Sequence, residues 1–166
     1  MSVEISEIKD TGELLLIRNL ALRIWPPTFE KILSEEQITY MLDRMYSMAS
    51  LEKQFENGHK FLLLSENEQP IGFLAYELNY AELSQIKIHK LYLIPELQGK
   101  GYGKKLLKHA ENLAQVNTQL SMVLNVNKYN PAIEFYKNYG FEIIAEEVID
   151  IGAGFIMDDY QMKKTL

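Results

Sequence analysis

Three glycines at alternate positions, Gly99, Gly101 and Gly103, stand between an apolar segment and a segment rich in lysine. Glycine adopts positive φ angles without steric cost and has no side chain to block a ligand, so such a loop can turn its backbone N–H groups inward. A helix directly behind the loop adds unpaired N–H groups and the positive end of its dipole. The segment therefore predicts a seat for a phosphate or a pyrophosphate.

The spacing of these glycines excludes two common phosphate loops. A dinucleotide-binding fold carries G-x-G-x-x-G after its first strand, whereas the pattern here is G-x-G-x-G and lies late in the chain. A P-loop has Gly-Lys followed by Ser or Thr, whereas Gly103-Lys104 is followed by Lys105. The remaining alternative is a flexible surface turn that caps a helix. Gln98, the three glycines and the three nearby lysines together favour the anion site.

The apolar periodicities predict the elements that position this loop. Strands are expected at residues 3–8, 61–64, 71–76, 86–93, 120–125, 141–151 and 155–164. Helices are expected from Asp10 or Thr11 to a stop at Pro26-Pro27, at residues 34–46 and 50–56, directly after the glycine loop, and from Asn130-Pro131 to Gly140. This order predicts a mixed α/β fold, with a mixed sheet and helices on both faces.

Length and composition narrow the class of protein. The 166 residues predict a single domain over 1–166, and no apolar run is long enough to span a membrane. A net charge of −6 argues against a nucleic-acid partner. The absence of cysteine excludes thiolate metal sites, and the histidines show no metal-ligand spacing, so no metal is expected. The N-terminus lacks the order of a signal peptide, which predicts a cytoplasmic protein.

Two motifs resemble the GNAT superfamily of N-acetyltransferases. Residues 98–103, QGKGYG, fit the coenzyme A pyrophosphate motif Q/R-x-x-G-x-G/A, and residues 91–95 resemble the splayed central strand of that family. Residues 130–141 resemble its second motif, N-x-x-A-x-x-F-Y-x-x-x-G-F. The resemblance implies a mostly antiparallel sheet of about seven strands. It also implies transfer of an acetyl group from acetyl-CoA to an amine, by direct attack in a ternary complex.

A looser likeness concerns the acceptor. Residues 25–29, 34–46 and 158–162 resemble the PaiA-type branch, which acetylates spermidine and spermine. A small cationic amine, with polyamines first, is therefore the expected substrate, and dimers among similar proteins make a homodimer possible. Three acidic residues are candidates for binding the cation, although ordinary solvated acids are the alternative: Glu30, Asp158 and Asp159. The competing functions are a protein or peptide N-acetyltransferase and a non-catalytic acyl-CoA-binding module.

The resemblance also assigns the donor site by position. The backbone of Leu91, Tyr92 and Leu93 is expected to bond the pantetheine arm like an added strand. The pyrophosphate is expected on the amides of Gln98, Gly99, Lys100, Gly101, Tyr102, Gly103 and Lys104. Lys104, Lys105 or Lys108 could reach the 3′-phosphate, but a solvated helix face is the alternative for these lysines. Asn130 is expected to bond the coenzyme, although a helix cap alone would explain it.

Catalysis requires a neutral amine. A primary amine with a pKa of about 10.4 is almost fully protonated at pH 7, so a base or a proton wire must take its proton. Lys87 stands where the family often has a carboxylate, and His89, two residues on and on the same strand face, is the nearest titratable substitute. Tyr136 matches the family tyrosine that protonates the leaving thiolate. An ordinary strand histidine and a core aromatic are the respective alternatives.

Overall fold

The computed structural model describes residues 2–166, and its elements follow the predicted order. The strands are β1 (Val3–Glu7), β2 (Lys60–Glu66), β3 (Gln69–Glu77), β4 (Gln85–Leu93), β5 (Ser121–Asn127), β6 (Glu142–Gly152) and β7 (Phe155–Thr165). The helices are α1 (Leu14–Phe29), α2 (Glu35–Tyr46), α3 (Met48–Glu56), α4 (Tyr102–Val116) and α5 (Ala132–Tyr139). Short 3₁₀ turns lie at η1 (Thr11–Glu13), η2 (Tyr80–Glu82) and η3 (Pro95–Leu97).

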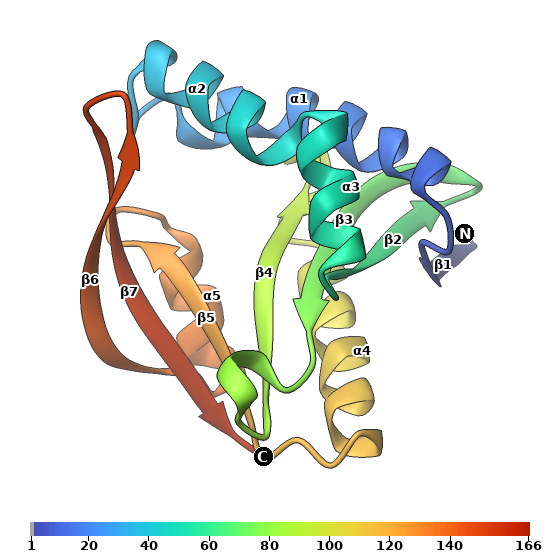
Figure 1. Cartoon of the computed structure of the whole chain (residues 1–166). Helices are drawn as coiled ribbons and strands as arrows, with labels where there is room; N and C mark the ends of the chain where they lie inside the picture. The colour runs from blue at the N-terminus through green and yellow to red at the C-terminus, as the bar shows by residue number, and fades with distance from the viewer. Residues whose placement is uncertain (1) are drawn as a thin grey trace.

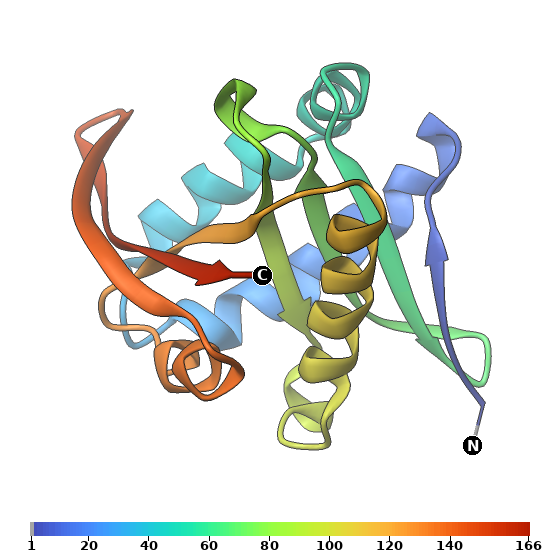
Figure 2. The same ribbon diagram turned by 90° about the horizontal axis from the view of Figure 1, so that it is seen from below.

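Within residues 2–166, the strands form one seven-stranded sheet in the order β1-β2-β3-β4-β5-β7-β6. The pairing is antiparallel everywhere in this sheet except between β4 and β5, which run parallel. Figure 2 shows α4 on one face of the sheet and α1 and α2 behind the other face. The predicted mixed α/β fold, mostly antiparallel and covered on both faces, is therefore confirmed.

The sheet opens at its centre. β4 and β5 pair only over four residues each, Gln85–Ile88 with Ser121–Leu124. Beyond this point β5 is paired with β7 alone. The last three residues of β4 keep their partners in β3, with Leu93 opposite Gly72. Their other edge is paired with no strand in the described part of the chain. Figure 1 shows β6 and β7 curving away from β4 toward α2, which leaves β4 and β5 splayed.

A bulge in β4 accompanies this opening. Ile88 is opposite Tyr76 of β3 and Lys90 is opposite Ala75, so His89 has no partner residue in the ladder. A bulge adds one residue to one strand, bends that strand and redirects side chains. The bulge lies directly before the segment whose outer edge is free, so it turns that end of β4 away from β5.

The first helix passes through the two prolines that were expected to stop it. α1 contains Pro26 and Pro27 and ends at Phe29. A proline lacks the N–H that would bond the carbonyl four residues earlier. Here those carbonyls belong to Leu22 and Arg23, which are exposed and can be hydrated, and the prolines themselves are exposed. The opposite side of the helix buries Trp25 and Phe29, and this burial keeps the helix intact to its end.

Side-chain caps set the other helix boundaries. Ser34 Oγ accepts a hydrogen bond of 3.1 Å from the Gln37 amide and begins α2 as expected. Ser47 caps α3 in the same way, and the helix therefore starts at Met48, two residues before its predicted start. Asn130 Oδ1 accepts a bond of 2.8 Å from the Ala132 amide before α5. None of the helices in residues 2–166 is long and apolar enough to cross a membrane.

Candidate active site

The glycine loop between β4 and α4 has the backbone conformation expected of an anion seat. Gly99 and Gly101 have φ angles of +80° and +84°, a region that L-amino acids with a side chain rarely adopt. A Cβ atom at either position would meet no atom within 4 Å. The glycines are therefore required by the turn itself, and the space in front of them is open to a ligand.

The backbone N–H groups of this loop are unpaired. From Gly99 to Lys104, none of them donates a hydrogen bond to a described residue, and the first helical bond runs from the Lys105 amide to the Gly101 carbonyl over 3.1 Å. Gln98 differs, because its amide bonds the Pro95 carbonyl at 3.3 Å. Free N–H groups at the positive end of a helix dipole form an anion-binding arrangement.

Neighbouring side chains hold the loop in place. The hydroxyl of Tyr102, which is buried, donates a hydrogen bond to the Glu66 carboxylate at the end of β2. Gly103 lies against α5, because a Cβ at this position would be 3.2 Å from Phe135 Cζ. Of the lysines, Lys104 borders a small hollow beside Phe135, whereas Lys108 approaches Glu111 at 3.6 Å.

The free edge of β4 leads directly to this loop. Leu91, Tyr92 and Leu93 are half-buried and pair with β3 on one side only. The Tyr92 ring packs against Trp25 at 5.6 Å and Phe73 at 5.8 Å, which fixes the strand on the helical face. A free strand edge that ends in unpaired N–H groups fits an extended chain terminated by a pyrophosphate, as coenzyme A is.

Tyr136 lies on α5 with its ring buried against Phe141 at 5.8 Å. Burial raises its pKa, so the hydroxyl stays protonated at neutral pH. That hydroxyl bonds no side chain or backbone group of the described residues. The pKa of Tyr92 is raised by burial and further by Tyr136 and Asp159.

On the other side of the splay, β4, β5, β6 and β7 enclose a cavity of about 270 Å³. Its polar walls are Lys87, Asn125, Glu147 and Gln161, and its apolar walls include Val123, Ile149 and Met162. The cavity therefore joins residues from four strands that are far apart in the sequence.

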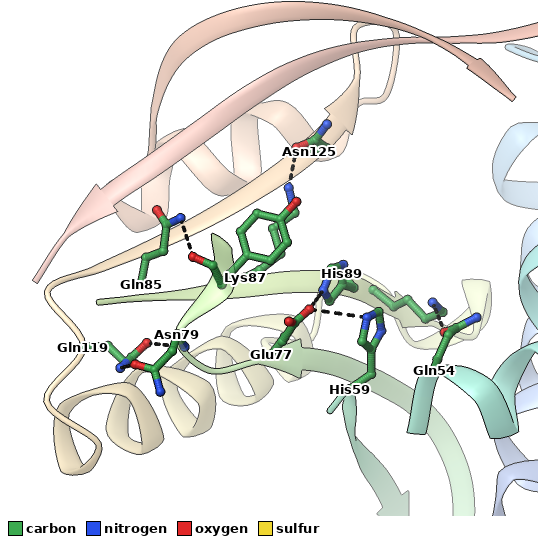
Figure 3. A network of polar contacts seen from close by, with 11 residues as sticks. Gln54, His59, Glu77, Asn79, Gln85, Lys87, His89, Gln119 and Asn125 are labelled. Carbon is green, nitrogen blue, oxygen red and sulfur yellow. Dashed lines mark hydrogen bonds and ion pairs between the residues drawn. The ribbon is translucent and has the colours of Figure 1, made fainter. Parts of the chain in front are cut away.

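A hydrogen-bonded chain crosses this cavity, and Figure 3 shows its first bond, between Lys87 and Asn125. Lys87 Nζ donates to Asn125 Oδ1 at 2.6 Å, and Asn125 Nδ2 donates to Glu147 Oε2 at 3.1 Å. Gln161 Nε2 donates to the same carboxylate at 2.5 Å. Burial lowers the pKa of Lys87, whereas Glu147, Asp159 and Glu77 oppose that shift. Lys87 thus places a primary amine inside the cavity, close to Glu147.

The three acidic residues expected to bind the acceptor cation lie in different places in the structure. Asp159 is 4% exposed and lies opposite Glu147 across the β6–β7 ladder. Burial raises its pKa to about 6, and Glu147 contributes to the rise. Asp158 pairs instead with Lys128 at 3.0 Å, because neighbouring residues of a strand point to opposite faces. Glu30 is exposed directly after α1.

His89 lies beside the cavity in a polar cluster, also shown in Figure 3. Its Nε2 is 2.9 Å from Glu77 Oε1, and its ring stacks on His59 with centroids 4.0 Å apart. Burial, assisted by His59, Lys90 and Lys87, lowers its pKa to about 2. The imidazole is therefore neutral at pH 7 and a weaker base than an ordinary histidine. Its role as the base stays a prediction.

The same cluster is the candidate for a metal ion. Ligand atoms of His59, Glu77 and His89 lie within 4.8 Å of one another. The two rings are parallel to within 8°, so their nitrogen lone pairs do not meet at one ion in both ring planes. The arrangement is two neutral imidazoles that share one carboxylate.

A connection that the sequence did not indicate holds the tip of the β6–β7 hairpin. Tyr40 Oη and Arg44 Nη1 of α2 each donate a 2.5 Å hydrogen bond to the Ile151 carbonyl. Gln37 Nε2 donates to the Ile156 carbonyl at 2.8 Å. The hairpin therefore arches over the cavity and is fastened to α2.

Comparisons with known protein sequences agree with this geometry. Residues 30–166 match the family model of the acetyltransferase (GNAT) domain. The spermidine N(1)-acetyltransferase of Thermoplasma acidophilum is 31% identical over 166 aligned residues, 95% of this chain and 97% of that protein. The peptidyl-lysine N-acetyltransferase YjaB of Escherichia coli is 32% identical over 94 residues, 55% of this chain and 56% of that protein. An uncharacterized N-acetyltransferase of Methanocaldococcus jannaschii is 34% identical over 99 residues, 55% of this chain and 42% of that protein. The chain thus spans about half the length of several curated relatives that it matches.

Solved structures show the same fold. The PaiA N-acetyltransferase from Thermoplasma acidophilum, solved in complex with coenzyme A, superposes with a TM-score of 0.82 at 27% identity, and the match covers 100% of both chains. A GCN5-related N-acetyltransferase from Rhodopseudomonas palustris superposes with a TM-score of 0.84 at 17% identity, over 100% of this chain and 97% of the other. At that identity the second match shows the fold alone.

Proposed function

This chain belongs to the GNAT family of acetyltransferases, and we propose that it transfers an acetyl group from acetyl-CoA to a primary amine of a small cationic acceptor. Polyamines such as spermidine are the first choice. One observation carries the proposal: unpaired N–H groups and a free strand edge lie on one side of the splay, and a cavity lined by Lys87 and Glu147, with the buried Asp159 opposite Glu147, lies on the other.

The donor side consists of backbone atoms. The amides from Gly99 to Lys104 hold the pyrophosphate at the positive end of α4, and Leu91–Leu93 bond the pantetheine arm along their free edge. Asn130 Oδ1 is used by the Ala132 amide, which leaves its Nδ2 for the coenzyme. When bound, acetyl-CoA supplies an acetyl group activated as a thioester. Tyr136, protonated at neutral pH, donates its proton to the leaving sulfur.

The acceptor side consists of side chains. A polyamine carries several ammonium groups, and the negative potential of Glu147 and Asp159 attracts them into the cavity. The arched hairpin gives this side an enclosed shape, which fits a slender amine better than a folded protein. Because both sides open at the same splay, amine and thioester can meet directly in a ternary complex.

A thiol-release assay tests this function. The purified protein is incubated with acetyl-CoA and, separately, spermidine, spermine, simple monoamines and a lysine peptide. We expect turnover with the polyamines at the highest kcat/KM. Preference for the lysine peptide would mean that the acceptor is a protein, as in the peptidyl-lysine N-acetyltransferase YjaB. Calorimetric binding of coenzyme A without turnover of any amine would favour a non-catalytic acyl-CoA-binding module.

Three further features remain proposals with the function. The single domain over 1–166 contains both sides of the splay, and limited proteolysis that leaves one fragment would support it. The cytoplasmic location and the homodimer stay predictions, to be checked by cell fractionation and by light scattering.

A further inference from the structure

We propose that Asp159 is the general base that takes the proton from the acceptor ammonium. This inference rests on the proposed function and deepens it, because it names the side chain that makes the amine nucleophilic. It replaces His89, which the sequence offered for the same task.

The strand register places Asp159 on the cavity side of β7. Gln161, two residues further and on the same face, lines the cavity, and so does Glu147, which lies directly opposite Asp159 on β6. Asp159 is 4% exposed and lies behind the residues that line the cavity. Asn125 bonds its carboxylate and so opposes the rise in pKa that burial causes, whereas Asp159 Oδ1 has no hydrogen-bond partner among residues 2–166. A buried carboxylate oxygen without a donor is costly. An acceptor ammonium would supply the missing donor.

The charged groups around Asp159 come from three strands. Glu147 faces it from β6, Lys87 from β4, and Asp158 precedes it on β7. The neutral hydroxyl of Tyr92 on β4 is also affected by the charge of Asp159. Hydrogen bonds from Gln161 and Asn125 lower the pKa of Glu147, so this carboxylate stays ionised. Two neighbouring carboxylates with opposite shifts are typical of acid–base sites. Glu147 therefore provides fixed negative charge, and Asp159 is the group free to change its protonation.

Enclosure makes the proton transfer between the acceptor ammonium and Asp159 less unfavourable than it is in water. In water an amine and an aspartate differ by about 6.5 pKa units. Burial raises the pKa of Asp159 to about 6 and lowers that of the enclosed Lys90 amine on β4 to about 8. For a similarly enclosed acceptor amine the gap narrows to about two units. In the transfer an N–H bond of the ammonium breaks, its electron pair stays on nitrogen, and an O–H bond forms on Asp159.

Lys87 provides an internal comparison for the acceptor. Its ammonium reaches the cavity, bonds Asn125 at 2.6 Å and lies over the Tyr80 ring at 5.0 Å. The walls of the cavity thus already hold one primary amine, which shows that they accept the group that the acceptor must bring.

The test compares Asp159→Asn with Asp150→Asn, an identical chemical change at an exposed position of the same hairpin. With spermidine and acetyl-CoA, we expect Asp159→Asn to lower kcat/KM at least about 100-fold. The wild type and Asp150→Asn should lose activity below about pH 6, and Asp159→Asn should lack this limb. A raised KM with the limb intact would mean that Asp159 only binds the cation, and would overturn the proposal.

A second measurement needs no catalysis. Carbon-13 NMR of the aspartate carboxyl groups in the free protein should show one signal that titrates near pH 6 and disappears in Asp159→Asn. A signal that titrates near pH 4 instead would contradict the assignment. In addition, sodium formate should restore part of the rate of Asp159→Ala, since it can fill the space and accept the proton. Calorimetry with coenzyme A checks that each variant is folded.

The two proposals fail in different ways. If the wild type acetylates no amine, the proposed function is wrong, and so is the assignment of Asp159 as the general base. If the wild type acetylates spermidine and Asp159→Asn keeps its rate and its pH profile, only the base assignment is wrong.

Discussion

The two sides of the splay between β4 and β5 are built from different atoms. The donor side consists of backbone groups: the free strand edge of residues 91–93 and the unpaired N–H groups of residues 99–104. The acceptor side consists of side chains from four strands, with Lys87, Asn125, Glu147 and Gln161 among its polar lining residues and Asp159 opposite Glu147. The donor side depends on backbone φ angles and little on which side chains the residues carry. The acceptor side depends on side-chain chemistry and on the register of the sheet.

This difference predicts which substitutions affect coenzyme binding and which affect the acceptor. Changes that restrict the backbone should damage coenzyme binding and leave the acceptor unaffected. Changes that remove a charge or a hydroxyl group should do the reverse.

Tyr136 lies buried on α5, and of the four changes below its loss should have the largest effect. Tyr136→Phe removes a hydroxyl that burial keeps protonated, and the aromatic packing on Phe141 remains. We expect kcat to fall about 100-fold, because general acid catalysis contributes at least this factor. Stopped-flow thiol release measures it, with coenzyme A affinity as the check on folding. A wild-type kcat would remove the acid role.

The second-largest effect is expected from a backbone change in the glycine loop, which should affect the donor side alone. Gly101→Val forces a β-branched residue to φ +84°, which costs about 2 kcal/mol and distorts the N–H groups of the loop. We expect the Kd for coenzyme A to rise about 30-fold. Gly58→Val is the matched control, because Gly58 has φ +99° and open space around it at the end of α3. Equal coenzyme affinity in the two variants would contradict the donor assignment.

The acceptor side should show a cost in stability. The folded pKa of Asp159, about 6, lies above its ordinary value of 3.8, so the folded protein binds this proton more tightly than the unfolded chain. Wild-type stability is therefore lost as the pH rises from about 4 to 6. Asp159→Asn should be about 1–2 kcal/mol more stable at pH 8, and equal at pH 3.5. Urea unfolding at both pH values measures this, and a pH-independent difference would exclude the titration.

The smallest effect concerns the arch. Tyr40→Phe removes one of the hydrogen bonds that fasten the hairpin to α2, while Arg44 still bonds the Ile151 carbonyl. A net loss of about 0.5–1 kcal/mol should raise the KM for spermidine about threefold. The Kd for coenzyme A should stay constant. Steady-state kinetics and calorimetry separate the two, and a change confined to the coenzyme would place the hairpin on the donor side.

The donor side could be predicted from the sequence because the signals that form it are local. The alternate glycines, the Ser34 cap and the Asn130 cap each act within a few residues, and the structure has each of them in the expected element. Family membership followed from the same stretches and is confirmed. The stop at Pro26-Pro27 failed because the solvent side of the helix tolerates unpaired carbonyls, which depends on packing elsewhere.

The acceptor side was only partly visible. Alternation along a strand implies that Asp158 and Asp159 face opposite ways, but the inward one follows from the register of β7 against β6. The bulge at His89 and the stacking on His59 depend on pairing with β3 and on the segment before β2. The contact of Lys87 with Asn125 joins two strands across the centre of the sheet. No periodicity in one segment contains this information.

The parallel ladder between β4 and β5 has a mechanical consequence. It runs only from Gln85–Ile88 to Ser121–Leu124 and is the shortest ladder of the described sheet. The sheet thus has two halves joined by a short ladder, one half carrying the free edge and the other carrying the hairpin, and the bonds between α2 and the hairpin join them a second time. A coenzyme laid along Leu91–Leu93 would extend that ladder toward the glycine loop and clamp the two halves. Binding the donor would then also set the width of the opening through which the amine arrives.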